Sequence, residues 1–322
     1  MDQAQPTRQE RYSYSSRPLE LVNRVREVQQ IYRMWQQGTG ERVYSTLAAV
    51  RQCEKHLQEH FGLKLDGLEI LDVGPGQQLK HMRALSVKNE VTGIDMDIVP
   101  QGFHLRDYVE LLRHSPVLRT AKTVTRKLLG WDTLFEKTLA QSLGVQSFPR
   151  LPVLRMDATR MSFPKASFDL VCSWSAFEHI ERPRTALAEV ARVLRPGGIA
   201  YLVIHLYTSH SGSHDPRTLT KEGMAPPYWP HLRPGHRDAV RPNCYVNEVR
   251  LDAWKQMFHE TMPGVRFIHE RHEELRPHLR ELKEQGELAD YSEDELLTVC
   301  LIGVWQKPHS ELAAEATPTK QP

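Results

Sequence analysis

Acidic side chains and a pair of glycines stand at the ends of short apolar runs, where they could bind a ligand. The run LEILDVGPGQQ contains Asp72 and breaks at Gly74 and Gly76, while EVTGID and LPVLRMDA place Asp95 and Asp157 at or near their ends. If these runs are parallel strands, their carboxyl ends share the sheet edge at which such folds bind ligands. Glycines let the backbone approach a ligand, an acidic residue after the second strand accepts hydrogen bonds from ribose hydroxyls, and the third-strand carboxylate could accept from an adenine amino group. The pattern favours a nucleoside-containing ligand over an ordinary strand-to-helix turn, although a lone pair of glycines is a weak signal.

The residue after the glycine turn argues against a nicotinamide or flavin dinucleotide. The dinucleotide fingerprint needs a third small residue three positions beyond the second glycine, where the helix packs closely on the strand. That position is the bulky Leu79. We therefore expect a nucleoside ligand of another kind.

Histidines supply the candidates for proton transfer. His179, His205 and His210 follow the fourth and fifth apolar runs, and histidine is the natural base near neutral pH if the acceptor is a hydroxyl. His205, at the end of the fifth run, is the best placed, whereas His179 could serve structure. The stretch HLYTSHSGSHDPR, with His214 and Asp215, could alternatively bind a metal ion. Its spacings match no standard signature, so we predict a base and no metal.

These residues depend on elements that the periodicity predicts. Apolar runs at 68–74, 90–95, 151–158, 167–175 and 197–205 alternate with helical stretches, which predicts an α/β fold with a doubly wound, Rossmann-like parallel sheet. Two more strands are expected at 265–271 and 296–305. Ahead of the sheet, apolar residues recur three and four apart over Leu19–Trp35 and Val43–Phe61, which predicts two amphipathic helices.

Composition limits the possible partners and cellular locations, and polar segments mark the ends of the folded part. The 322 residues are 40% hydrophobic with a net charge of +2, so electrostatics give no support for nucleic-acid binding. Polar, aperiodic ends at 1–16 and 307–322 are predicted to be disordered, around N-terminal helices at 17–65 and a main domain at 66–306. No apolar run is long enough to span a membrane, no signal-peptide layout is visible, and the four cysteines are widely separated. We therefore expect a cytoplasmic protein without disulfides.

Two connections, 100–150 and 206–250, are too long for plain loops and are expected to form a cap that recognises the acceptor. The second offers side chains that suit a sugar or phenol: Trp229, His231, Arg233, Tyr245 and Asn247. A proline-rich lid with self-packing aromatics is the alternative. The first reads as helical, and its basic residues predict a solvated face in preference to a surface for anionic membranes: Arg106, Arg113, Arg119, Lys122, Arg126 and Lys127.

Four motifs, taken in order, resemble those of class I S-adenosylmethionine-dependent methyltransferases: LDVGPGQQ, VTGIDMD, RMDATRMSFPKASFDLVCSWSAFEHIERP and ALAEVARVLRPGGIAYLVI. The resemblance spans about residues 66–205 and is to the broad type that includes the ubiquinone and menaquinone methyltransferases. It implies a seven-stranded sheet that ends in an antiparallel hairpin, a turn at 194–198 before strand five, and S-adenosylmethionine as cofactor. Gln78 departs from the pattern, because many members have a third glycine there.

The resemblance also implies a role for each cofactor residue. The glycine turn and the helix start would receive the methionine carboxylate, and Asp72 its amino group. Asp95 would bind the ribose and Asp157 the adenine. The other positions would line the cofactor: Met96 and Ala158 at the adenine faces, and Ser173 and Trp174 beside the sulfonium. Core packing is an equal alternative for Trp174.

Together these features predict a methyltransferase for a small-molecule acceptor, with oxygen favoured as the methylated atom of a sugar, polysaccharide precursor or secondary metabolite. A membrane-associated quinone or a lipid-linked acceptor is the second hypothesis, and a non-catalytic cofactor-binding protein is the third. The sequence indicates no nucleic-acid partner and no oligomeric state.

Overall fold

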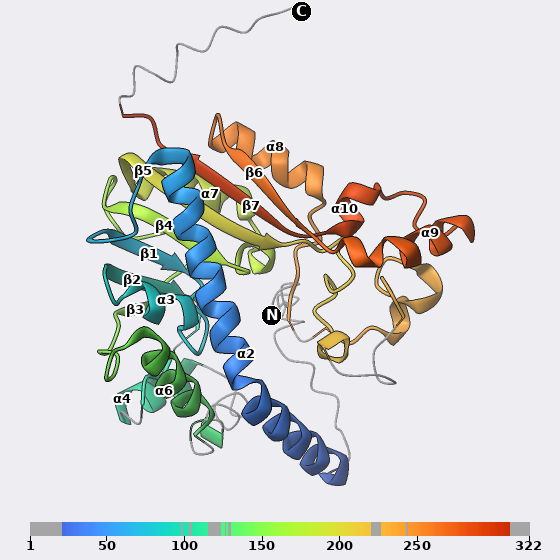
Figure 1. The fold of residues 1–322 in the computed structure, drawn as a ribbon, viewed down its shortest axis with the longest axis horizontal. Coiled ribbons are helices and arrows are strands. Elements are labelled where there is room, and N and C mark those ends of the chain that lie inside the picture. Colours follow the sequence, from blue (N-terminus) through green and yellow to red (C-terminus); the bar gives the residue numbers. More distant parts are fainter. Residues whose placement is uncertain are drawn as a thin grey trace, which may run out of the picture. The chain divides into compact units, whose positions relative to one another are not determined.

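The protein is represented by a computed structural model that describes residues 21–97, 99–102, 105–114, 124–125, 127, 130–219, 227–242 and 244–309 (Figure 1). The predicted disordered ends, 1–16 and 310–322, lie outside these residues. So do three of the basic residues of the first insertion: Arg119, Lys122 and Arg126.

Seven strands form one sheet in the order β3-β2-β1-β4-β5-β7-β6. Their bounds are β1 Glu69–Val73, β2 Glu90–Asp95, β3 Val153–Arg155, β4 Phe168–Trp174, β5 Leu194–His205, β6 Arg266–Arg271 and β7 Thr298–Gln306. β1 runs parallel to β2 and β4, β2 runs parallel to β3, and β7 is antiparallel to both β5 and β6. The predicted doubly wound sheet and its antiparallel end are confirmed. One detail differs, because 194–198 lies within β5 and is not a turn before it.

The chain folds as two compact units whose boundary falls within β4. The N-terminal unit runs from Arg17 to Cys172, and the C-terminal unit comprises the described residues from Ser173 onward. Each unit is described by itself.

In the N-terminal unit, a single helix replaces the two that the sequence predicts. α2 runs without a break over Leu21–Phe61, through Gly38 and Gly40. Glycine costs about 1 kcal/mol in a helix but keeps its N–H donor, so packing can offset it. α2 packs on α3 (Lys80–Leu85) and α6 (Trp131–Leu143), as Figure 1 shows, through a cluster of buried side chains: Val43, Leu47, Ala84, Phe135 and Leu139. The first insertion also contains α4, Leu105–His114.

In the C-terminal unit, α7 (Pro183–Val193) packs against α8 (Leu251–Thr261). In the described parts of the second insertion, 206–219, 227–242 and 244–250, the helical elements are two short 3-10 turns, η2 Pro216–Leu219 and η3 Pro234–Ala239. η1 (Phe177–His179) follows β4, and η4 (Glu273–Leu275), α9 (Arg276–Glu284) and α10 (Glu293–Leu297) lie between β6 and β7.

Order continues past the end of β7. The Lys307 ammonium donates hydrogen bonds to the carbonyls of Ala191 and Leu194, at 2.7 and 2.8 Å, at the end of α7. A cation is favourable at a helix C-terminus because the last carbonyls lack partners. The predicted boundary at 307 is therefore placed too early.

Candidate active site

The glycine turn after β1 requires its glycines for their backbone conformation. Gly74 and Gly76 have φ values of 73° and 66°, in the left-handed region that L side chains rarely adopt. The Gly74 N–H donates to the Ile94 carbonyl at 2.8 Å, which ties the turn to β2. The following helix begins only at Lys80, after a left-handed Leu79 whose side chain is buried. α3 therefore starts four residues beyond Gly76.

Asp72 lies in β1 and is 1% exposed, and its Oδ2 atom has no hydrogen-bond partner. Burial, with a smaller contribution from the charge of Asp95, raises the pKa of the Asp72 carboxyl to about 8. A buried carboxyl is costly unless a cation or a donor pairs with it. An ammonium group from a ligand would supply that partner, so the site fits the amino-acid end of S-adenosylmethionine.

The other strand-end carboxylates are held by their own loops. Asp95 accepts from the Asp97 N–H at 2.8 Å, and Asp157 accepts from the N–H and the hydroxyl of Thr159, each at 2.8 Å. Such local turns fix the orientation of a carboxylate. Met96 is 55% exposed, as a side chain that lies against a ligand face could be, whereas Ala158 is buried.

The two predicted sulfonium neighbours belong to the C-terminal unit. Ser173 is fully buried, and Trp174 is half-buried with its ring 6.1 Å from that of Tyr201. Trp174 thus retains exposed surface while also packing on a neighbouring strand.

Gln78 is a structural link between the glycine turn and two helices. Its amide oxygen accepts a hydrogen bond from Arg42 of α2, and its amide nitrogen donates to Asp132 of α6 at 3.2 Å. Asp132 also forms a buried ion pair with Lys127 at 2.8 Å. A glycine at this position would lose both links. Lys127, predicted as part of a basic surface, is 8% exposed and faces the interior.

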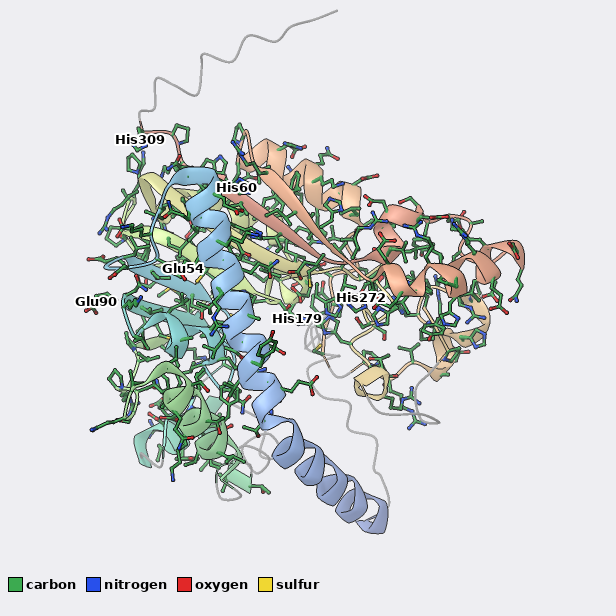
Figure 2. The ribbon with its side chains drawn as sticks, viewed as in Figure 1. Glu54, His60, Glu90, His179, His272 and His309 are labelled. Atoms are coloured by element: carbon green, nitrogen blue, oxygen red, sulfur yellow. The ribbon has the colours of Figure 1, made fainter. Side chains whose placement is uncertain are left out.

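Two of the predicted histidines, His179 and His205, lie in the C-terminal unit close to His214, with ring centroids 4.8 Å from that of His214; Figure 2 labels His179. The His205 Nε2 atom lies 2.9 Å from the Ser211 hydroxyl, and burial, followed by neighbouring histidines, lowers the pKa of His205 to about 4. His179 donates through Nδ1 to the Tyr245 carbonyl at 2.6 Å, and burial lowers its pKa.

Glu178 is a site residue to which the sequence assigned no role. It is 1% exposed, and neither carboxylate oxygen has a hydrogen-bond partner. Burial raises the pKa of its carboxyl to about 8. Glu178, His205 and His214 each place one potential ligand atom within 4.8 Å of the others. The sequence grouped His205 and His214 with His210 and Asp215 instead.

His210 and Asp215 lie outside this group. The His210 ring lies 5.1 Å from that of His272, and the Asp215 carboxylate is paired with the Arg217 guanidinium. Of the four side chains in the predicted metal alternative, His205 and His214 lie in this group and His210 and Asp215 do not.

A cavity of about 570 Å³ in the C-terminal unit can hold a small molecule. Its wall includes Tyr207, Ser213, His231, Arg237, Glu248 and Arg250. The His231 Nε2 atom donates to the Tyr207 carbonyl at 2.7 Å, which leaves Nδ1 as a buried acceptor without a partner.

The remaining predicted acceptor residues serve structure. Trp229 is 0% exposed and belongs to a hydrophobic cluster with Leu279 and Leu297. Arg233 is ion-paired with Glu287 in two hydrogen bonds. The last two residues contact η1. The backbone carbonyl of the buried Tyr245 accepts a hydrogen bond from His179, and the Asn247 side-chain amide donates to the carbonyls of Phe177 and Ile180, at 2.9 and 3.0 Å. Of the five, only His231 lines the cavity.

Comparisons with known proteins agree with the fold. Residues 117–202 match the family model described as a methyltransferase domain. No curated protein sequence matches the chain significantly.

Solved structures with similar folds share little sequence with the chain. Phosphoethanolamine N-methyltransferase 2 of Haemonchus contortus, in complex with S-adenosyl-L-methionine, is 16% identical over 80% of this chain and 52% of that one, with a TM-score of 0.43. The cyclase SpnF is 17% identical over 80% of this chain and 81% of its own, with a TM-score of 0.37. A SAM-dependent methyltransferase of Methanosarcina mazei is 17% identical over 79% of this chain and 98% of its own, with a TM-score of 0.39. The chain spans about half the length of the Haemonchus enzyme. The strand order of the sheet and the methyltransferase-domain match over 117–202 define the fold.

Proposed function

Because the chain contains a class I S-adenosylmethionine-dependent methyltransferase domain, we propose that it transfers the cofactor methyl group to an oxygen atom of a polar small molecule. In this proposal Asp72 pairs with the cofactor ammonium and the turn at Gly74 and Gly76 receives its carboxylate. Asp95 accepts from the ribose and Asp157 from the adenine. The remaining predicted positions line other parts of the cofactor: Met96 and Ala158 the adenine faces, and Ser173 and Trp174 the sulfonium. Methyl transfer is an in-line displacement, so these contacts act by aligning the donor and excluding water.

The polar wall of the cavity is the observation that supports this acceptor class. Tyrosine, serine, histidine, arginine and glutamate side chains surround the space, with only a few aliphatic groups among them. The His231 Nδ1 atom on this wall is a buried acceptor without a partner. A hydroxyl of a sugar or another polyhydroxylated molecule can donate to it, whereas a quinone ring with an isoprenoid tail has no donor to offer. A hydroxyl acceptor must lose a proton, for which the sequence favoured His205, with His210 and His179 as further candidates.

The membrane-acceptor alternative loses part of its basis. Lys127, one of its basic residues, is buried against Asp132. Among the described residues, no helix combines the length and the apolar character needed to cross a membrane. As part of the proposal we expect the protein to work in the cytoplasm.

The proposal can be tested with S-adenosylmethionine labelled in the methyl group. The protein is incubated with free sugars, nucleotide sugars and phenols, and in parallel with quinones in vesicles, and labelled products are identified by mass. We expect transfer to a hydroxylated acceptor. His231→Gln should lower kcat/KM for that acceptor by about tenfold, the value of one hydrogen bond, without changing the cofactor Kd. The exposed His259→Gln is the control.

Two results would contradict the proposal. Transfer to vesicle-bound quinones alone would favour the membrane acceptor. Tight cofactor binding without transfer to any acceptor, including those of a cell extract, would favour the non-catalytic alternative.

A further inference from the structure

One cluster of side chains in the C-terminal unit lacks the partners that its burial demands. Glu178 projects from η1, His205 ends β5, and His214 lies in the turn that follows. Both carboxylate oxygens of Glu178 and the Nε2 atom of His214 are buried without a hydrogen bond. Buried polar atoms are nearly always paired in folded proteins, so three such atoms in one place point to a missing ligand.

The ligand atoms of this cluster are already close together. One potential ligand atom each from Glu178, His205 and His214 lie within 4.8 Å of one another, and a second set of His179, His214 and Cys244 satisfies the same limit. The His214 ring centroid lies 4.8 Å from that of His179 and 4.8 Å from that of His205. His214 is common to both sets.

The backbone holds these side chains in place at some cost. His214 has a φ of 52°, a left-handed conformation that is strained for a non-glycine residue and is concentrated at functional sites. η1 is fastened by Asn247, whose side chain donates to the carbonyls of Phe177 and Ile180 and whose N–H donates to that of Glu178 at 2.8 Å. The hydroxyls of Ser209 and Ser211 lie within 3.2 and 2.9 Å of His205 Nε2. Such outer contacts orient metal ligands in known sites.

We propose that Glu178, His205 and His214 bind a divalent transition-metal ion, for which Zn²⁺ is the best match. Two imidazoles and one carboxylate are a ligand set of catalytic zinc sites, which leave a further position open for water or substrate. Mg²⁺ and Ca²⁺ fit poorly, because they prefer six or more oxygen ligands. In this assignment His205 is a metal ligand and not a general base.

The site adjoins the proposed acceptor cavity. Cys244, which reaches the His214 ligand atom in the second set, lines the cavity, and so does Ser213, the residue before His214. Resting on the proposed function, the open position would take the acceptor hydroxyl and lower its pKa. The O–H proton then leaves to water, the oxygen forms its bond to the methyl carbon, and the carbon–sulfur bond breaks to leave a neutral thioether.

Zinc binding can be measured without cofactor or acceptor. The full-length protein is stripped with a chelator, titrated with ZnCl₂ by calorimetry in the presence of a competing chelator, and analysed for bound metal by mass spectrometry. We expect one Zn²⁺ per chain, and a loss of affinity of at least about 100-fold in both Glu178→Gln and His214→Ala. His210→Ala is the matched control: His210 belongs to the same segment and has an unpartnered Nδ1, but lies outside both sets. It should bind zinc as the wild type does.

The outcomes separate this proposal from the proposed function. If the wild type takes up no stoichiometric zinc, if His214→Ala binds as tightly as His210→Ala, or if Mg²⁺ competes equally, the metal site is wrong. Retained cooperative unfolding of each variant excludes misfolding as the cause of a loss. Equal methyl transfer by stripped and zinc-loaded protein would overturn the activation of the acceptor. Zinc binding in a protein that methylates nothing would instead refute only the proposed function.

Discussion

Asp72 should make the cofactor-free protein less stable as the pH rises, and Asp72→Asn should remove that dependence. The ordinary pKa of the group is 3.8, and burial raises it to about 8 in the folded chain. Between these values the unfolded chain has lost the proton and the folded chain retains it. Fewer protons on the unfolded state mean that stability falls with pH, by about 1.4 kcal/mol per pH unit. From pH 5 to pH 7 the free energy of unfolding of the wild type should therefore fall by about 3 kcal/mol relative to the variant.

Urea denaturation at pH 5, 6 and 7 measures this difference directly. The amide side chain of the variant carries no charge at any of these pH values. The free energy of unfolding of the variant, measured relative to that of the wild type, should therefore increase as the pH increases. The exposed Asp66→Asn controls for general effects of charge. Asp72→Asn should also lower the affinity for S-adenosylmethionine at least tenfold, because the amide cannot pair with the ammonium. A gap that does not change between pH 5 and 7 would refute the buried, protonated state, and undiminished affinity would refute the assignment to the ammonium.

Three further changes test other parts of the structure. Gln78→Ala should lower the free energy of unfolding by about 1–3 kcal/mol in urea, because it removes the hydrogen bonds that join the glycine turn to Arg42 of α2 and Asp132 of α6; an unchanged midpoint would show that the link is dispensable. Gly303→Ala should destabilise by about 1–3 kcal/mol, because its Cβ would lie 2.6 Å from the Phe258 ring, whereas Gly235→Ala has nothing within 4 Å and should leave the melting temperature nearly unchanged. Lys127→Ala should leave co-sedimentation with anionic vesicles unaltered, since the ammonium is buried in an ion pair; a loss of vesicle binding would revive the membrane hypothesis.

The sheet could be predicted from the sequence because each strand carries its own signal. A continuous apolar run bounded by polar or glycine residues identifies a buried parallel strand wherever it occurs, and β2 and β6 fall within a residue of their predicted bounds. The same rules failed at the N-terminus, where two separate apolar stripes predicted two helices but α2 continues through the glycines at 38 and 40. The packing of α2 on α3 and α6 outweighs their low helix propensity, and that packing depends on residues far along the chain.

Residues with distant partners could not be predicted. The two partners of Gln78 lie 36 and 54 positions away, so no local pattern shows that the side chain replaces a glycine for structural reasons. Arg233 looked like an acceptor ligand, but its carboxylate partner is 54 positions away. Arginine serves ion pairs and ligands with the same group, so only the fold decides between them.

Burial without a hydrogen-bond partner distinguishes the candidate binding residues from the other acidic residues and histidines of the chain. The chain has 40 acidic residues and 16 histidines, and residue type alone favours none of them. Among the described residues, the buried carboxylate oxygens without a hydrogen bond belong to Asp72 and Glu178 alone. Each of these carboxyls lowers the stability of the ligand-free chain, and a cation would restore the lost interaction: an ammonium group at Asp72 and a metal ion at Glu178. The same physical criterion thus supports the proposed cofactor contact, which the strand ends also predicted, and the proposed metal site. The strand ends did not predict the metal site, because Glu178 meets His205 and His214 only after β4, β5 and the turn at His214 have folded together.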